Sequence, residues 1–224
     1  MKTNNIWLIL LLGFFAISSC KKDDDTEPII TPDPTDTIPD EKFEVININT
    51  TNGDIWIWLY DTTAQHKANF LKLAGEGFYD STTFHRIIDG FMIQGGDPNS
   101  KDSDTTNDGT GGPGYTIPAE FVSTLTHVQG AVAAARQPDS VNPQKESSGS
   151  QFYIVENESG TPHLDENYTI FGQVMAGINV VETIAIQPKN QANNRPYADI
   201  KMTVKVAEKT EAELKTEFGW DIPQ

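Results

Sequence analysis

Short apolar segments separated by turn-forming residues are the feature that most constrains the fold of this chain. Eight such segments occur, at residues 43–49, 54–59, 83–87, 91–94, 130–135, 151–155, 169–174 and 200–206. The first two alternate apolar with polar residues and flank Thr51-Asn52-Gly53, a composition typical of a hairpin turn. Because many short strands with few helices favour a sheet that closes on itself, the sequence predicts a mainly β fold, a closed eight-stranded antiparallel barrel.

Helical periodicity occurs in only a few places. Residues 64–75 carry apolar side chains at helical spacing and end at glycine, and residues 179–186 predict a second helix. We expect these two helices to cap the barrel. Residues 208–224 form a C-terminal extension, in which residues 211–218 predict a short helix of unassigned role.

The first twenty residues have the pattern of an export signal. Lys2 supplies the only charge, residues 6–17 are largely apolar, and small residues precede Cys20. The apolar run is shorter than the about 20 residues that a transmembrane helix needs. The sequence Ile17-Ser18-Ser19-Cys20 resembles a bacterial lipobox, which implies that residues 1–19 are a signal peptide and that Cys20 is lipidated.

Cys20 is the only cysteine, so no disulfide can form within one chain. Lipidation explains a lone cysteine in an exported protein, and the alternative is an incidental buried thiol. Several acyl chains would hold the protein on a membrane. We therefore expect a lipid-anchored protein in the cell envelope of a Gram-negative bacterium, at the outer membrane, with surface exposure as an open alternative.

The segment that follows Cys20 lacks the apolar residues needed for a core. Residues 21–42 contain eight acidic residues, three basic residues and four prolines. This composition favours a solvated, extended tether over residues 20–42 that leads to a folded domain at residues 43–207. The Lys-Lys-Asp-Asp-Asp run in the tether also resembles surface-export signals of Bacteroidetes lipoproteins.

The formal net charge of the chain is −16 at pH 7. A strongly negative protein has no general affinity for phosphate backbones, so nucleic acid is not an expected partner. The folded domain is itself acidic after the leader and tether are set aside. We expect it to be soluble and monomeric.

The strongest functional signal lies at residues 84–97. This segment reads Phe-His-Arg-Ile-Ile-Asp-Gly-Phe-Met-Ile-Gln-Gly-Gly-Asp and is similar almost residue for residue to the cyclophilin signature. The resemblance continues, in the family's order, through Gly109-Thr-Gly-Gly, Gly130-Ala-Val-Ala-Ala-Ala-Arg136, Gly149-Ser-Gln-Phe-Tyr153, Leu164-Asp165 and Phe171-Gly172-Gln-Val174. It covers residues 43–207 and implies a cyclophilin-like barrel with peptidyl-prolyl cis/trans isomerase activity on proline-containing polypeptides.

Arg86 and Gln94 are the catalytic residues that the resemblance implies. Rotation about an X–Pro bond needs no bond to be made or cleaved, so an enzyme has only to favour the twisted state of the amide. Arg86 would donate hydrogen bonds near the prolyl nitrogen and carbonyl, and Gln94 would steady the arginine and contact the substrate carbonyl. Read alone, Arg86 would be a surface arginine in an ion pair and Gln94 an ordinary strand residue.

The resemblance also implies a set of substrate-binding residues. Phe91 and Met92 match the floor of an apolar pocket for the proline ring. Ala135 and Arg136 match a strand whose backbone pairs with an extended substrate. The complete set is Phe91, Met92, Ala135, Arg136, Gln151, Tyr153, Leu164 and Tyr168.

Three positions depart from the family pattern. Tyr153 stands where better-studied members carry phenylalanine, His163 where many cyclosporin-sensitive members carry tryptophan, and Tyr168 replaces a pocket histidine. These departures imply weak or no cyclosporin binding but leave the catalytic donor in place. The loop at residues 137–148 is longer than usual, and we expect it to influence substrate choice.

No cofactor and no metal are predicted. The four histidines show no ligand spacing, and the Gly109-x-Gly111-x-x-Gly114 pattern lacks the flanking strand and helix of a dinucleotide site. Residues 97–108 are rich in Asp and Asn without the EF-hand spacing, so loosely held Ca²⁺ is an alternative only. A rival hypothesis of a different class is a membrane-tethered module that binds proline-containing segments with little or no turnover.

Overall fold

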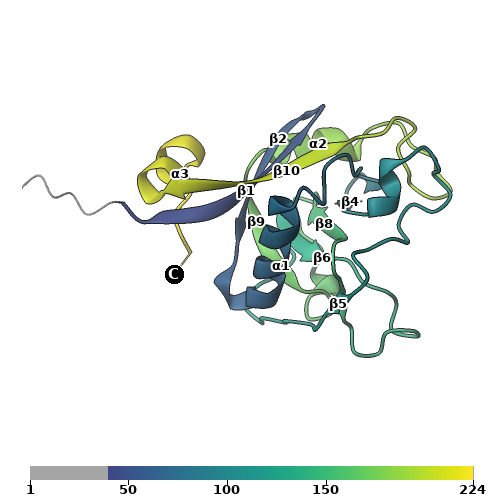
Figure 1. Ribbon diagram of the computed structural model, residues 1–224, viewed down its shortest axis with the longest axis horizontal. Coiled ribbons are helices and arrows are strands. Elements are labelled where there is room, and N and C mark those ends of the chain that lie inside the picture. The colour runs from purple at the N-terminus through teal and green to yellow at the C-terminus, as the bar shows by residue number, and fades with distance from the viewer. Residues whose placement is uncertain (1–39, 224) are drawn as a thin grey trace, which may run out of the picture. The chain divides into compact units, whose positions relative to one another are not determined.

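The large antiparallel sheet has eight strands. The computed structural model describes residues 40–223, so the predicted signal peptide, Cys20 and nearly all of the tether lie outside the described residues. The strands are β1 (Lys42–Thr50), β2 (Gly53–Leu59), β3 (Arg86–Ile88), β4 (Met92–Gly95), β6 (Ala131–Ala134), β8 (Phe152–Val155), β9 (Ile170–Ala176) and β10 (Met202–Thr210). They are ordered β10-β1-β2-β9-β6-β8-β4-β3 and curl around an apolar interior (Figure 1).

The closed barrel expected from the sequence is corrected to a curled half-barrel. β3 and β10 are the edges of the sheet, and within residues 40–223 no strand ladder joins them. β3 has only three residues, and the whole of β10 pairs with β1, from Met202 opposite Thr50 to Thr210 opposite Lys42. Beside the two edges, an isolated bridge pairs Thr83 with Lys201, and backbone hydrogen bonds on either side of it join residues 81–84 to residues 200–202.

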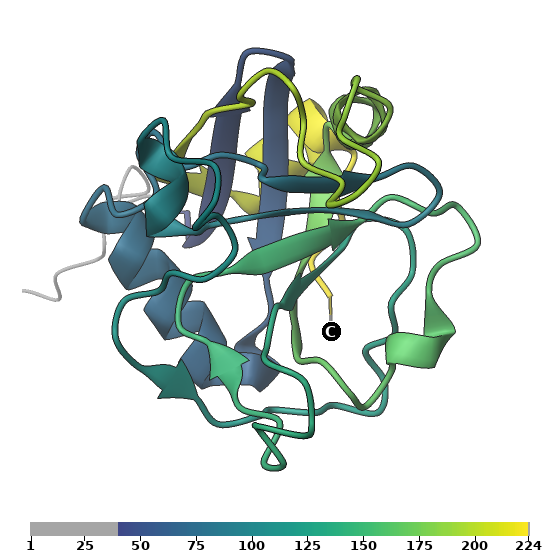
Figure 2. The same cartoon turned by 90° about the vertical axis from the view of Figure 1, so that its right-hand side faces the viewer.

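Two helices pack into the same apolar interior of the curled sheet, at separate places around it (Figure 2). α1 (Ala64–Gly75) follows the short 3-10 helix η1 (Asp61–Thr63) and packs on β9 and β10, and α2 (Ile178–Ala185) packs on β2, β3 and β4. α1 directs the buried side chains of Phe70 and Leu73 into the core. The apolar face of α2 is buried in the same core, so both predicted helices cover the sheet.

Smaller elements surround the sheet. β5 (Thr116–Ile117) and β7 (Ser147–Ser148) form a separate two-stranded sheet that the sequence did not predict. The 3-10 helices η2 (Pro98–Lys101) and η3 (Pro162–Leu164) lie in the loops after β4 and β8. These elements hold the loops that border the candidate site.

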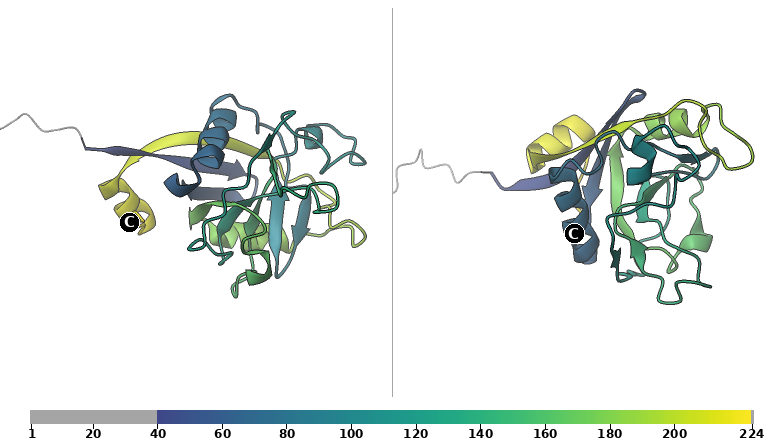
Figure 3. Two further views of the ribbon diagram at one scale, coloured as in Figure 1. Left: turned by 90° about the horizontal axis from the view of Figure 1, so that it is seen from below. Right: turned by 45° about the vertical axis from the view of Figure 1, so that its right-hand side comes forward.

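The C-terminal helix α3 (Glu211–Phe218) occupies the residues for which the sequence predicts a helix, at the far end of β1 and β10 (Figure 3). It begins with a capping box, in which the Thr210 side chain accepts from the N–H of Glu213 while the Glu213 carboxylate accepts from the N–H of Thr210. Leu214 is fully buried against Val45 and Trp58. The helix therefore covers apolar surface on the outer face of the sheet.

Buried histidines predict that the fold loses stability in acid. His66, His85 and His127 are 2%, 6% and 2% exposed, and burial lowers the pKa of each imidazole below 6.5. Below pH 6.5 the unfolded chain therefore binds protons that the folded chain does not, so the free energy of unfolding falls as the pH falls. Thermal unfolding should give a Tm several degrees lower at pH 5 than at pH 7.5.

An equal Tm at pH 5 and pH 7.5 in the wild type would contradict the assignment of neutral buried histidines.

Candidate active site

One cavity gathers nine of the ten predicted catalytic and substrate-binding residues. It has a volume of about 260 Å³ and lies on one face of β3, β4, β6 and β8. The lining residues are Arg86, Phe91, Met92, Gln94, Ala135, Arg136, Tyr153, Leu164 and Tyr168. The tenth residue, Gln151, lines an adjoining groove.

Strand register explains why these residues meet. Arg86 on β3 lies directly opposite Gln94 on β4, and Gln94 lies opposite Tyr153 on β8. Directly paired residues of an antiparallel sheet point to the same face. Met92 is two residues before Gln94 and shares its face. The sequence of the β3–β4 hairpin therefore places the charged donor beside the apolar floor.

Arg86 is half-buried and its guanidinium has only neutral partners among residues 40–223. Its Nη1 donates to Oε1 of Gln94 at 3.4 Å and lies 3.8 Å from Sδ of Met92. No ion pair of the described residues involves Arg86. Burial lowers the pKa of the guanidinium, but arginine stays charged in proteins. A positive donor fork is thus held at the cavity without a carboxylate to neutralise it.

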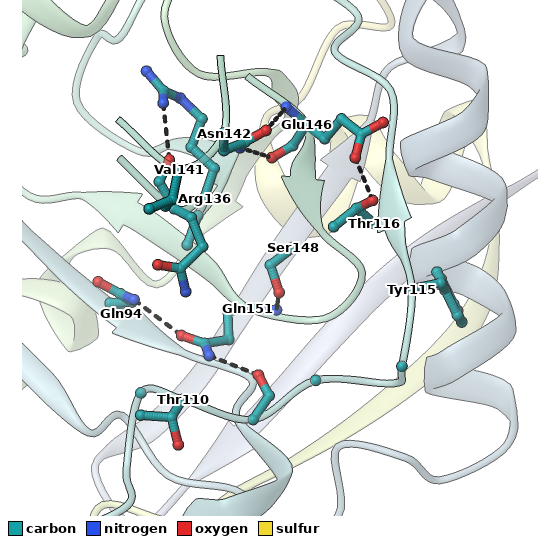
Figure 4. Close-up of a pocket in the computed structure, with 16 residues that line it drawn as sticks. Gln94, Thr110, Tyr115, Thr116, Arg136, Val141, Asn142, Glu146, Ser148 and Gln151 are labelled. Carbon is teal, nitrogen blue, oxygen red and sulfur yellow. Dashed lines mark hydrogen bonds between the residues drawn. The ribbon is translucent and has the colours of Figure 1, made fainter. Parts of the chain in front are cut away.

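A chain of glutamine side chains fixes the position of Gln94. Gln94 Nε2 donates to Oε1 of Gln151 at 3.2 Å, and Gln151 Nε2 donates to the carbonyl of Gly111 at 2.8 Å (Figure 4). Gln94 thereby turns its amide oxygen toward Arg86. The structure gives Gln151 a place in the wall of the adjoining groove, one step from the cavity.

The remaining surface of the cavity is apolar and aromatic. Met92 is 1% exposed and Tyr153 is 5% exposed. The Tyr168 ring packs edge-on against the Tyr153 ring with centroids 5.8 Å apart, and Phe91 stacks on His163 at the rim. Burial raises the pKa of the Tyr153 phenol, so it stays protonated. Such a surface can accept a small apolar ring.

Arg136 places its side chain in the wall of the cavity. Its guanidinium lies 4.6 Å from the Tyr168 ring centroid, its Nε donates to the carbonyl of Asn167 at 2.7 Å, and Asp139 pairs with its charge. Cation–π stacking holds Tyr168 in the cavity wall. The sequence predicted a backbone role for this position and gave no signal for the stacking, because Asn167 and Tyr168 are remote in the chain.

The backbone of Ala135 is already paired within the chain. Its N–H donates to the carbonyl of Gln151 at 2.9 Å, and its carbonyl accepts from the N–H of Ser148 at 2.8 Å. β6 ends at Ala134, so Ala135 lies beyond the strand in which the sequence placed it. Both hydrogen-bonding groups of the Ala135 backbone are therefore occupied by Ser148 and Gln151, and these bonds fix the side of Ala135 that faces the cavity.

The adjoining groove is larger, with a volume of about 740 Å³ (Figure 4). It shares Gln94, Ala135 and Arg136 with the first cavity. The glycine-rich segment 109–116 forms one part of its wall, and the long loop at residues 137–148 forms another. The lining includes residues outside the predicted catalytic and substrate-binding set, among them Thr110, Tyr115, Thr116, Val141, Asn142 and Glu146.

A fully buried carboxylate anchors the glycine-rich wall. Asp97 accepts from the backbone N–H groups of Gly109 and Gly111, and from that of Asn99 at 2.8 Å. These hydrogen bonds use the Asp97 carboxylate to hold the backbone of this wall. Within residues 40–223, no group of three or more His, Cys, Asp or Glu side chains is arranged to hold a metal ion.

No helix in the described part of the chain has the length and apolar character needed to cross a bilayer.

Comparisons with known proteins agree with the geometry of the site. The sequence model of the family described as cyclophilin type peptidyl-prolyl cis-trans isomerase/CLD matches residues 45–206. The chain is 44% identical over 119 residues to peptidyl-prolyl cis-trans isomerase B of Bacillus subtilis, covering 53% of this chain and 73% of that protein. It is 41% identical over 127 residues to a peptidyl-prolyl cis-trans isomerase of Synechococcus elongatus, covering 56% of this chain and 77% of that protein.

Solved structures show the same fold. The crystal structure of a cyclophilin type peptidyl-prolyl cis-trans isomerase from Cryptosporidium parvum superposes with a TM-score of 0.64 at 29% identity, covering 74% of this chain and 98% of that one. The same enzyme solved in the presence of the dipeptide Ala-Pro gives a TM-score of 0.61 at 28% identity, covering 73% of this chain and 98% of that one. The family model, the relatives and the fold agree, and this chain therefore belongs to the cyclophilin family of peptidyl-prolyl cis-trans isomerases.

Proposed function

We propose that the cavity beside Arg86 holds the proline ring of an exported or surface polypeptide, and that Arg86 and Gln94 catalyse rotation about the X–Pro bond. The observation that carries this proposal is the guanidinium of Arg86, held against an apolar cavity with only neutral partners among the described residues. The Cryptosporidium enzyme was solved in the presence of the dipeptide Ala-Pro, which supports proline-containing peptides as the substrate class.

The barrier to rotation comes from amide resonance. Twisting the bond costs about 18–20 kcal/mol and leaves a localised lone pair on the prolyl nitrogen. Arg86 would donate to that nitrogen and stabilise the twisted state more than either planar isomer, which is the condition for catalysis. Gln94 orients the donor and offers a further contact for the substrate carbonyl.

The apolar residues would fix one side of the rotating bond. Met92 and Tyr153 form buried surface on which the proline ring can pack, while Phe91 and Leu164 lie at the same cavity. Holding the ring still lets the rest of the peptide swing through the twisted state. No proton is transferred in this scheme, so the rate at saturating peptide should be nearly constant from about pH 6 to 8.

The rival function is a tethered module that binds proline segments with little or no turnover. His163 and Tyr168 are the departures that favour it, and they also support the proposal that cyclosporin binds weakly. A protease-free isomerisation assay on the full-length protein separates the two functions. Catalysed exchange of a proline peptide supports the enzyme, and peptide binding without faster exchange supports the module.

The place of action is a separate part of the proposal. The lipobox-like sequence before Cys20 supports a lipid anchor in the cell envelope. We expect a labelled fatty acid to be incorporated into the wild type and not into Cys20→Ser, and we expect the variant to be recovered outside the membrane fraction. Recovery of wild type and Cys20→Ser in the same cell fraction would contradict the anchor. Protease treatment of intact cells then tests surface exposure.

A further inference from the structure

A chain of three hydrogen-bonded side chains runs from the protein surface to the wall of the proline cavity. Oδ1 of Asp165 lies 2.7 Å from Nδ1 of His127, and it also accepts from the backbone N–H of His127 at 2.8 Å. Nε2 of His127 lies 2.8 Å from the hydroxyl of Tyr153. The Asp165 side chain is 25% exposed, whereas the His127 side chain is fully buried. Solvent and cavity wall are thus connected through one imidazole.

The carboxylate of Asp165 determines where the hydrogens of this chain lie. Nδ1 of His127 must carry a hydrogen to donate to the ionised carboxylate, so Nε2 of the neutral ring is an acceptor. The Tyr153 hydroxyl therefore donates to Nε2. Because His127 is not among the residues that line the cavity, the hydroxyl hydrogen is directed away from the substrate side.

Packing reinforces this orientation of the Tyr153 ring. The His127 and Tyr153 ring centroids are 6.0 Å apart, and the two planes are within 10° of parallel. The Tyr168 ring packs edge-on against the Tyr153 ring, at an interplanar angle of 84°. Tyr153 on β8 is also paired with Ala133 on β6. The ring is held on several sides, and its hydroxyl has one buried partner.

We propose that His127 and Asp165 are positioning residues, which hold the Tyr153 ring as a fixed wall of the proline cavity and keep its hydroxyl hydrogen out of that cavity. The role rests on the proposed function, because it acts on the same substrate. It assigns a purpose to the tyrosine at a position where better-studied members of the family carry phenylalanine. A proton added to His127 would undo the arrangement.

The groups that face His127 influence the pH at which the imidazole gains this proton. Asp165 and His163 face it from the η3 region, and Tyr153 faces it from β8. Burial lowers the pKa of His127, and the hydrogen bond and charge of Asp165 only partly oppose this effect. Burial alone would raise the pKa of Asp165, but its bonds to His127 outweigh that effect and lower it. The imidazole is therefore neutral at pH 7.5 and gains its proton in acid, while Asp165 is still ionised.

Protonation reverses one hydrogen bond. The imidazolium has donors at both nitrogens, so Nε2–H donates to the Tyr153 oxygen and the phenol hydrogen loses its acceptor. That hydrogen must turn toward the cavity or stay unpaired, and both outcomes weaken the grip on an apolar ring. Binding is weakened in the planar and twisted states alike, so KM should rise while kcat changes little.

The decisive experiment compares full-length wild type with Tyr153→Phe from pH 7.5 to 4.5. The wild type should show KM rising by about threefold to tenfold toward acid, from the loss of one buried hydrogen-bond partner, with kcat nearly constant. Tyr153→Phe has no hydroxyl to reorient, so its KM should not change with pH. Circular dichroism in the same buffers confirms that both proteins stay folded.

Equal dependence of KM on pH in both proteins, or none in either, would overturn the positioning role. Absence of turnover in the wild type at every pH would instead refute the proposed enzyme. The dissociation constant of the peptide, measured at the same pH values, decides the positioning role in that case, because the same rise is expected in it.

A second comparison works at pH 7.5. Asp165→Asn removes the carboxylate that keeps the imidazole hydrogen of His127 on Nδ1, so it should raise KM in the wild-type background. The same change in a Tyr153→Phe background should have a clearly smaller effect, because the two residues act through one chain of bonds. Equal effects in both backgrounds would show that Asp165 acts on the fold in general and would contradict the proposal.

Discussion

Arg86→Ala is expected to lower kcat/KM by about 100-fold to 1,000-fold, the usual cost of removing one preorganised donor from a developing charge. The effect should appear mainly in kcat, because the apolar cavity that holds the ring remains. Arg86→Lys keeps the charge but loses the planar fork and its bond to Gln94, so it should retain only part of the activity. Protease-free isomerisation kinetics of the full-length proteins give both values.

Fold disruption would not explain this result. Arg86 is half-buried, and the side-chain hydrogen bonds of its guanidinium in the described residues are to Gln94 and Met92 alone. The Tm of Arg86→Ala should therefore stay close to that of the wild type. Equal kcat/KM in wild type and Arg86→Ala would show that the reaction does not depend on this donor.

Phe152→Ala is expected to cost about 3–5 kcal/mol of unfolding free energy, as is typical when a buried aromatic ring is truncated. Phe152 is 1% exposed on β8, and its ring lies 5.3 Å from Phe70, 6.0 Å from Tyr79 and 6.2 Å from Phe84. It therefore joins α1 to the β3 region through one aromatic cluster. Urea unfolding followed by fluorescence measures the loss.

Phe121→Ala is the control, because Phe121 is 40% exposed. A surface change of this kind should alter the unfolding free energy by about 0.5 kcal/mol or less. A loss below about 1 kcal/mol in Phe152→Ala would mean that the cluster is not part of the cooperative core.

Local patterns were sufficient to predict the individual strands and helices. Alternation in residues 43–49 and 54–59 corresponds to β1 and β2, and the helical spacing of residues 64–75 corresponds to α1. Local sequence patterns did not show which strands form the edges of the sheet. The pairing of β10 with β1 depends on contacts between residues more than 150 positions apart, and no ladder of the described strands joins β10 to β3.

The site was predictable to the extent that it is carried by one hairpin. Arg86, Met92 and Gln94 lie within nine residues, and their register follows from the turn between β3 and β4. The stacking of Arg136 on Tyr168 and the link from Asp165 through His127 to Tyr153 join separate parts of the chain. No spacing rule reports such contacts, so only the folded structure reveals them.

The most direct test is the cis/trans exchange rate of a proline peptide while it is bound to the protein, measured by NMR exchange spectroscopy at saturation. The account predicts fast exchange on the wild type, and on Arg86→Ala an exchange rate about 100-fold lower with a dissociation constant within about fivefold. Unchanged exchange on Arg86→Ala, or binding to the wild type without faster exchange, would contradict the claim that this guanidinium stabilises the twisted amide.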